Sequence, residues 1–203
     1  MFALIQKDPS ADVVALNGSG RAPQAANATA LRAKGLGTIP LHSAEAITVP
    51  GAVDGFCRMA EDFGNLSLGD ILAPAIHYAR TGVPVAPRVA SGWDRSAALL
   101  QGTARDKFLI AGVAPKVGQR FASPYQADAL ECITANGRDG FYAGAVAKDM
   151  VASLKAVGGS HSMEDFAARN LNDVKDIKNF VRDNNDNFKT LSAEVLEKVK
   201  SIN

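Results

Sequence analysis

Glycine and proline are distributed unevenly along this chain of 203 residues, and their distribution limits what the chain can fold into. All 18 glycines and all 9 prolines precede residue 160. Because proline interrupts helices and glycine ends them, we expect short helices and strands in this part of the chain. From about residue 169 the sequence is instead rich in asparagine, lysine and aspartate. We therefore divide the chain into residues 1–168 and a charged tail, residues 169–203, whose composition is compatible with a different origin.

Strand signals concentrate near the start of the chain. Residues 2–6 and 13–16 are strand-like and flank the turn residues 7–12, which predicts a β-hairpin. A third strand is predicted at residues 45–49, directly before Pro50.

Helical signals cover most of the remaining sequence, which predicts a helix-rich α/β (α+β) fold. The best-marked helix starts after Ser67, an N-cap residue, and ends at Gly82. Pro74 within it predicts a kink or a break. Further helices are predicted from apolar spacing and glycine stops at residues 24–32, 52–63, 88–100, 124–136 and 144–156, and after Ser162.

Charge and hydropathy argue against several classes of protein. The chain has 22 basic and 21 acidic side chains, a balance that gives no attraction to nucleic acid or to an anionic membrane. No apolar run approaches the roughly 20 residues that span a bilayer. The apolar residues 1–5 are too few for a secretory signal. On the sequence as it stands we predict a soluble, cytoplasmic chain, whereas a periplasmic or secreted protein would need a different N-terminus.

The potential metal ligands lack the spacing of a metal site. His42, His77 and His161 lie far from one another and from Cys57 and Cys132. Both cysteines occupy apolar helical contexts, in which free thiols behave as small hydrophobes. We predict no metal site and no cofactor.

The tail has the spacing of an amphipathic helix. Its apolar residues recur every three or four positions: Val174, Ile177, Val181, Phe188, Leu191, Val195, Val199 and Ile202. One helix, or two that meet near Asn184, could pair with a second copy or with another protein. A non-enzymatic interaction protein is therefore one candidate function.

Four stretches of sequence resemble the γ-glutamyltranspeptidase family, and their order and spacing over residues 1–168 make the resemblance specific. They are Asn17-Gly18-Ser19-Gly20-Arg21-Ala22-Pro23, Ile47-Thr48-Val49-Pro50-Gly51-Ala52-Val53-Asp54-Gly55, Leu68-Gly69-Asp70-Ile71-Leu72-Ala73-Pro74-Ala75-Ile76 with Thr81-Gly82-Val83-Pro84, and Gly140-Phe141-Tyr142-Ala143-Gly144 with Glu164-Asp165-Phe166.

The resemblance implies both a fold and a chemistry. Members of this family of N-terminal-nucleophile hydrolases are four-layer αββα sandwiches, so residues 1–168 would form part of one, from the large subunit. Their precursor cleaves itself, and the new N-terminal threonine of the small subunit attacks a γ-glutamyl or related acyl amide. The resemblance thus implies a small acyl-amide substrate, a γ-glutamyltransferase or glutathione hydrolase activity, and a small subunit as the missing partner.

No catalytic residue can be assigned in this sequence. In the family the nucleophilic threonine follows the region that matches residue 168, and here the asparagine-rich tail occupies that place. None of the threonines lies in a match to the autocleavage motif. The chain is therefore expected to be a fragment that is inactive alone, and a truncated or chimeric product without function is a further alternative.

Two residues of the first stretch are candidates for substrate binding. Typical family members carry Arg-Glu-x-Ala-Pro, whose arginine binds the substrate α-carboxylate through its planar fork of donors. Counting back from Ala22 places Ser19 at that position, whereas Arg21 directly precedes Ala22. This pattern looks more like the cephalosporin or glutaryl acylase branch. Arg21 then either reaches an acyl carboxylate or only braces its loop.

Three other noticeable residues are interpreted structurally. Tyr142 is expected to pack a helix start against a sheet, and Trp93 to pack among apolar side chains. Asp54 fits the first turn of a helix, where the helix dipole favours a carboxylate.

Overall fold

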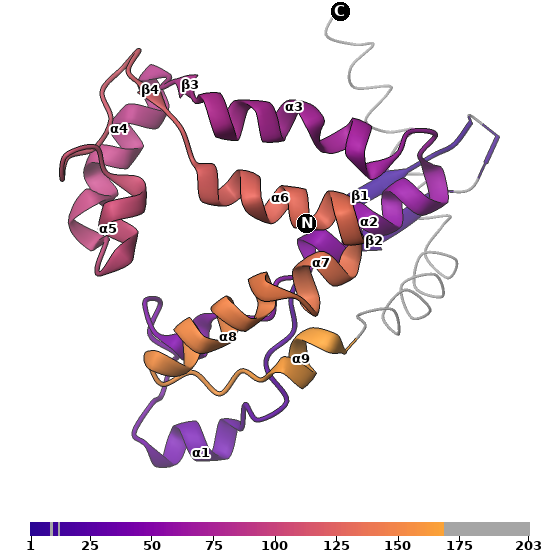
Figure 1. Cartoon of the computed structure of the whole chain (residues 1–203). Coiled ribbons are helices and arrows are strands. Elements are labelled where there is room, and N and C mark those ends of the chain that lie inside the picture. The colour runs from indigo at the N-terminus through magenta and orange to yellow at the C-terminus, as the bar shows by residue number, and fades with distance from the viewer. Residues whose placement is uncertain (9, 12, 169–203) are drawn as a thin grey trace, which may run out of the picture. The chain divides into compact units, whose positions relative to one another are not determined.

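The structure of the protein is a computed structural model that describes residues 1–8, 10–11 and 13–168 (Figure 1). The tail at residues 169–203, with its predicted amphipathic helix, lies outside the described residues. The described part forms two compact units, residues 66–141 and the residues on either side of them.

The first unit opens with the predicted hairpin. Strands β1 (Phe2–Ile5) and β2 (Val14–Asn17) pair antiparallel, with Phe2 opposite Asn17 and Ile5 opposite Val14. Leu16 points into the core, while Phe2 and Leu4 are 76% and 67% exposed on the alternate positions.

The predicted third strand at residues 45–49 is wrong. Ala44–Ala46 form a single 3₁₀ turn, η1, and only Val49 pairs, through one isolated bridge to Arg21. Alanine and glutamate have a low preference for strands, and Pro50 lacks the N–H that would extend a ladder. The apolar run alone was therefore an insufficient signal.

The described residues of the first unit include the helices α1 (Ala28–Ala33), α2 (Ala52–Phe63), α8 (Ala145–Ala156) and α9 (Met163–Ala167). The starts of α2, α8 and α9 agree with prediction. Helix α1 begins later than expected, because the Asn27 side chain accepts from the Ala30 N–H and caps it there. Side chains from these helices and from Tyr142 fill the core of the unit: Cys57, Tyr142, Ala147, Val151 and Phe166.

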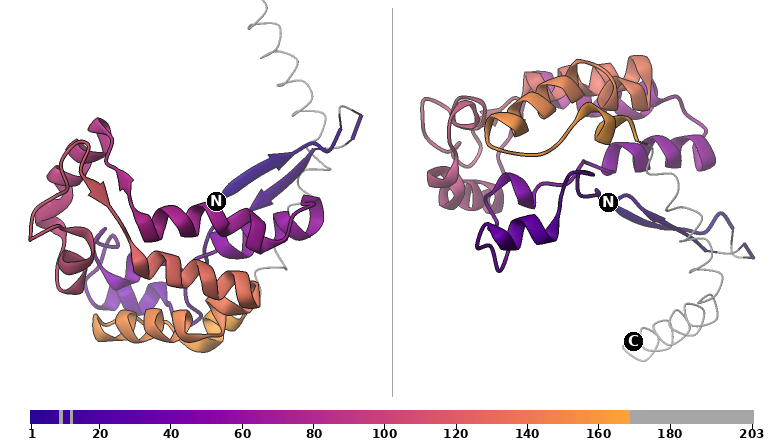
Figure 2. Two further views of the ribbon diagram at one scale, coloured as in Figure 1. Left: turned by 45° about the horizontal axis from the view of Figure 1, so that its top comes forward. Right: turned by 90° about the horizontal axis from the view of Figure 1, so that it is seen from below.

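Two long helices form the centre of the second unit. Helix α3 (Leu68–Thr81) lies beside α6 (Pro124–Asn136) in Figures 1 and 2. The Ser67 hydroxyl caps α3, and Gly82 ends it with a positive φ of 77°. Helix α3 continues through Pro74, so the predicted break did not occur. One lost backbone bond is outweighed here by packing along α6.

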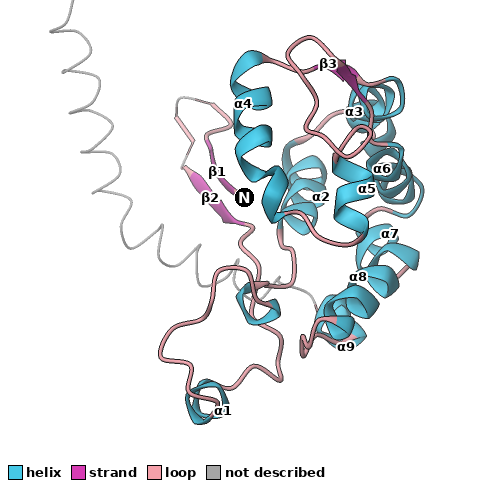
Figure 3. Cartoon of the chain, turned by 90° about the vertical axis from the view of Figure 1, so that its left-hand side faces the viewer, coloured by secondary structure: helices cyan, strands magenta, loops and turns pink. Residues whose placement is uncertain are grey.

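The rest of the second unit consists of short elements that Figure 3 shows in succession. The predicted helix at residues 88–100 is divided into α4 (Pro87–Ser96) and the 3₁₀ turn η2 (Ala97–Leu99). The remaining elements are α5 (Thr103–Phe108), the strand pair β3 (Val83–Pro84) and β4 (Arg120–Phe121), and α7 (Arg138–Tyr142), which leads into the first unit.

Trp93 packs in this second unit, as predicted. Its ring lies edge-on to Phe121, with 4.6 Å between the ring centroids. Beside it is an open apolar hollow of about 360 Å³, lined by Val89, Gly92, Trp93, Ser96, Leu100 and Phe108.

The described residues confirm the predicted helix-rich α/β class. Their named strands form two two-stranded sheets. None of the described helices is long and apolar enough to span a bilayer. Cys57 is buried, Cys132 is half-buried, and no disulfide joins the two.

Candidate substrate-binding loop

The two candidate binding residues lie in one loop of the first unit, residues 17–23. Ser19 is exposed, and both its N–H and its hydroxyl donate to the side-chain oxygen of Asn17. Arg21 is also exposed, and its backbone carbonyl accepts from the Val49 N–H at 2.8 Å. The main chain at Arg21 is therefore held by the Val49 N–H, while the residue itself is exposed.

Two glycines let this loop lie directly against residues 48–51. A Cβ atom on Gly20 would lie 2.1 Å from the Val49 carbonyl oxygen, and one on Gly51 would lie 2.5 Å from the Ser19 carbonyl oxygen. Both distances are far inside van der Waals contact with backbone atoms. The loop and its support therefore meet main chain to main chain, with no room for a side chain at either glycine.

Replacing Gly20 by alanine is expected to lower the free energy of unfolding by about 2 kcal/mol, because backbone on both sides must move. Gly37→Ala is the matched control, since a Cβ there meets no atom within 4 Å. Urea unfolding of both variants measures the difference. Equal stability of the two variants would show that the close contact at Gly20 does not exist in solution.

The Tyr142 side chain holds the segment that supports the loop, through hydrogen bonds at Pro50 and Asp54. It is 1% exposed, and its hydroxyl donates to the Pro50 carbonyl at 2.6 Å and accepts from the Asp54 N–H at 3.1 Å. Gly51, the N-cap of α2, has no side chain with which to cap the helix. The Tyr142 hydroxyl supplies that missing acceptor.

Tyr142 is buried at a helix start, in line with its interpretation as a packing residue: its ring centroid lies 6.5 Å from that of Phe166, and its hydroxyl is bound at the start of α2. The packing of that helix start against a sheet stays a prediction. Asp54 occupies the first turn of α2, as predicted.

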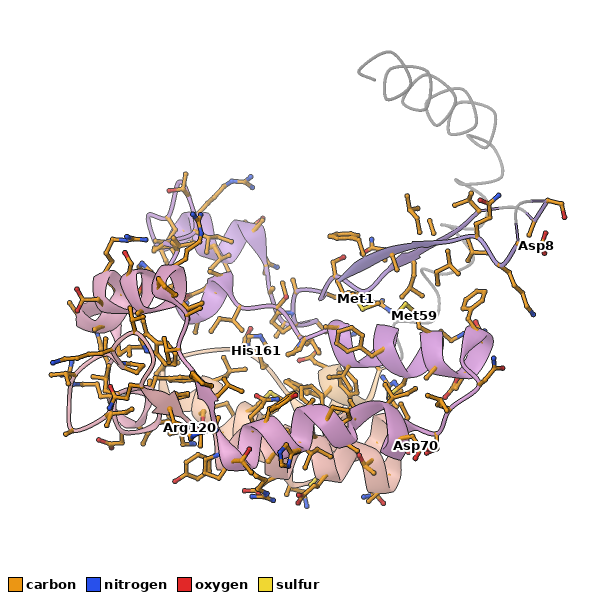
Figure 4. All side chains as sticks on the ribbon, turned by 90° about the horizontal axis from the view of Figure 1, so that it is seen from above. Met1, Asp8, Met59, Asp70, Arg120 and His161 are labelled. Atoms are coloured by element: carbon orange, nitrogen blue, oxygen red, sulfur yellow. The ribbon has the colours of Figure 1, made fainter. Side chains whose placement is uncertain are left out.

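His161 supports the same segment from a third direction. The side chain is 1% exposed, and its Nε2 lies 2.9 Å from the Ile47 carbonyl oxygen. Because a carbonyl only accepts, Nε2 carries the proton and donates. The buried Nδ1 has no hydrogen-bond partner within the described part of the chain. Figure 4 shows His161 among the side chains around it.

Asp165 holds the end of the loop. One of its carboxylate oxygens accepts from the Gln24 N–H at 2.8 Å, and the other accepts from the Ser162 N–H at 2.9 Å. The second bond, with the Ser162 hydroxyl bound to the Asp165 N–H, forms a capping box that starts α9. Partial burial acts to raise the pKa of Asp165, but the N–H donors of Gln24 and Ser162 outweigh it and lower the pKa.

This lowered pKa predicts a loss of stability in acid. Because the folded-state pKa of Asp165 lies below its unfolded value of about 3.9, its contribution is present above that pH. It disappears as the pH falls through the folded-state pKa. Urea unfolding between pH 7 and pH 2 should therefore show a shallower acid loss for Asp165→Asn than for the unchanged protein. The exposed Asp149→Asn variant is the control, and matching acid profiles for Asp165→Asn and the unchanged protein would refute the assignment.

Sequence reasoning located the loop but missed the residues that support it. His161 was considered only as a potential metal ligand, and Asp165 only as part of the fourth family-like stretch and of the helix predicted after Ser162. Among the described residues no group of three or more His, Cys, Asp and Glu side chains is placed to hold a metal ion. The assembled geometry can present a guanidinium at a fixed point of an exposed loop, which suits recognition of a carboxylate.

Comparisons with known proteins identify the family. The sequence model of γ-glutamyltranspeptidase matches residues 1–185. The chain is 39% identical over 155 residues to the glutathione hydrolase-like YwrD proenzyme of Bacillus subtilis and 32% identical over 171 residues to the oxamate amidohydrolase proenzyme of Klebsiella pneumoniae. These matches cover 75% and 79% of this chain but only 29% and 31% of those proteins.

Solved structures show the same relationship at the level of the fold. The γ-glutamyltranspeptidase of Helicobacter pylori superposes with a TM-score of 0.77 at 27% identity, over 84% of this chain and 50% of that one. The cephalosporin acylase of Bacillus halodurans gives a TM-score of 0.75 at 35% identity, over 83% of this chain and 33% of that one. The resemblance drawn from the four stretches is confirmed, acylase-like relatives included. The chain belongs to the γ-glutamyltranspeptidase family of amidohydrolases.

Proposed function

We propose that this chain is the acyl-recognition part of a γ-glutamyltranspeptidase-type amidohydrolase and that Arg21 binds a carboxylate of the acyl group. The fixed main chain at Arg21 carries this proposal, because a guanidinium discriminates well only when its position is set in advance. The bond between its carbonyl and the Val49 N–H, together with the close contacts at Gly20 and Gly51, sets that position.

The favoured substrate is an amide of a dicarboxylic acyl group such as glutaryl. In the typical family motif the arginine for the α-carboxylate of a γ-glutamyl group would stand at Ser19. The Ser19 hydroxyl is bound within the loop to Asn17 and cannot form a bidentate ion pair. Similarity to proteins named acylase and cephalosporin acylase supports the same preference.

The catalytic nucleophile is proposed to come from a small-subunit segment that this sequence does not contain. Its N-terminal threonine oxygen would attack the amide carbonyl and its own amine would take the proton. The amine product leaves with that proton, and water then hydrolyses the acyl–threonine ester to the free acid. Several similar proteins bear the name proenzyme, which supports a processed precursor. The chain by itself is proposed to be inactive.

Complementation tests this function. The full chain is refolded with the small subunit of the Bacillus subtilis relative, and release of p-nitroaniline from glutaryl and γ-glutamyl anilides is followed. We expect no turnover by the chain alone, and turnover by the mixture with glutaryl preferred. The relative's own large subunit is the positive control. If that control is active and the mixture remains inactive, the proposed function is wrong.

A further inference from the structure

Burying the His161 side chain at this position costs free energy, because one of its two ring nitrogens has no hydrogen-bond partner among the described residues. The side chain is 1% exposed, yet only Nε2 has a hydrogen-bond partner and Nδ1 has none among the described residues. A leucine of similar size would fill the same space without the unpartnered Nδ1, but it would also remove the donor to the Ile47 carbonyl. Buried polar atoms without partners are rare in proteins and call for an explanation beyond packing.

The chain around His161 fixes the direction of its ring. Gly158 has a positive φ of 87° and ends the turn after α8, and the Gly159 N–H donates to the Leu154 carbonyl at 2.8 Å. A Cβ on Gly159 would lie 3.2 Å from His161 Nδ1 and 2.8 Å from the Leu154 carbonyl oxygen. The main chain of Gly159 therefore lies against the Nδ1 edge of the ring. The opposite edge, which carries Nε2, is directed toward Ile47.

The hydrogen bond from His161 reaches the segment on which Arg21 depends. Its acceptor is the Ile47 carbonyl, and two residues farther along the Val49 N–H donates to the Arg21 carbonyl at 2.8 Å. Thr48, between them, adds its side chain to the Val49 carbonyl in excluding a Cβ on Gly20. A shift of this segment would therefore move the main chain at Arg21.

The same part of the chain also holds the far end of the loop. Asp165, four residues after His161, accepts the Gln24 N–H three residues beyond Arg21. Residues 161–165 therefore hold the loop at two points: indirectly at Arg21, through residues 47–49, and directly at Gln24. The capping box at Ser162 and Asp165 makes these five residues a single ordered turn.

Building on the proposed function, we infer that His161 is a positioning residue for carboxylate recognition. It acts through Ile47 and Val49 to fix the position of the main chain from which the Arg21 side chain extends. It touches neither substrate nor nucleophile in this role. It contributes the hydrogen bond from Nε2–H to the Ile47 carbonyl, which keeps residues 47–49 where the Val49 N–H can donate to Arg21.

The test uses the full chain labelled with ¹⁵N and three histidine variants. Hydrogen exchange of the Val49 amide reports the contact to Arg21, and a titration with glutarate reports carboxylate binding. For His161→Leu we expect Val49 exchange to be faster and glutarate affinity weaker, each by about two- to tenfold, the effect of one hydrogen bond. His161→Gln, whose side-chain amide can restore the N–H donor, should return both within about twofold. His77→Leu, at an exposed histidine of α3, should change neither.

Each other outcome has a definite meaning. Unchanged exchange and affinity in His161→Leu, or a glutamine variant as impaired as the leucine variant, would overturn the inference. If His161→Leu does not fold, comparison of His161→Gln with the unchanged chain decides it. If the unchanged chain binds no glutarate, carboxylate recognition by the isolated chain fails, and Val49 exchange then tests the positioning role alone.

Discussion

Replacing Arg21 by alanine is expected to reduce kcat/KM of the complemented enzyme for a glutaryl anilide by about 10- to 100-fold. A hydrogen-bonded charge pair contributes about 1.5–3 kcal/mol, and a bidentate guanidinium–carboxylate pair lies toward the upper end of that range. The loss should be seen as a rise in KM at nearly constant kcat, because the pair is present in the bound substrate and in the transition state alike.

Two comparisons isolate the ion pair from general damage to the loop. The same variant should hydrolyse an acetyl anilide, which has no second carboxylate, as well as the unchanged enzyme does. Arg32→Ala, which removes an exposed arginine of α1, should leave both substrates unaffected. Arg21→Lys should fall between, since an ammonium keeps the charge but loses the fork. If Arg21→Ala slows both substrates equally, Arg21 braces the loop and the carboxylate assignment is wrong.

Truncating Tyr142 to alanine is expected to cost about 3–5 kcal/mol of unfolding free energy, the range for a large aromatic residue removed from a core. The side chain is 1% exposed, so the cavity left behind cannot be filled by solvent-facing neighbours without rearrangement. The start of α2 would also lose the acceptor for the Asp54 N–H. Urea unfolding followed by far-ultraviolet circular dichroism measures the change.

The phenylalanine variant separates the two parts of that effect. Tyr142→Phe keeps the ring and removes the hydroxyl, so we expect a loss of about 1–2 kcal/mol from the unsatisfied N–H at the start of α2. Tyr78→Ala on α3, where the side chain is 57% exposed, should change stability by about 0.5 kcal/mol or less. A Tyr142→Phe variant as stable as the unchanged protein would show that ring packing alone matters.

The elements that sequence reasoning predicted well are those specified by their own nearby residues. Ser67 and Gly82 mark the two ends of α3, and each acts through bonds within four residues. The hairpin β1–β2 needs only a turn between two apolar runs. Periodicity and caps are local properties, and a sequence read in short windows contains them.

The support of the loop could not be predicted in the same way. Tyr142 and Pro50 are 92 residues apart in sequence, and His161 and Ile47 are 114 apart. Such pairs depend on how the helices pack, which no window of sequence reports. The error at residues 45–49 has the same cause: an extended apolar run becomes a strand only when a partner strand is present, and here only Val49 has one.

The bare N-cap of α2 has a consequence for how this protein can change over evolutionary time. Gly51 must lack a side chain because the Ser19 carbonyl lies against it, and the helix therefore depends on a hydroxyl from a residue 91 positions later in the chain. A serine at position 51 would cap the helix by itself but would push the loop away. Positions 51 and 142 are thus mutually constrained, and among descendants that keep this loop we expect the two to be inherited as a pair.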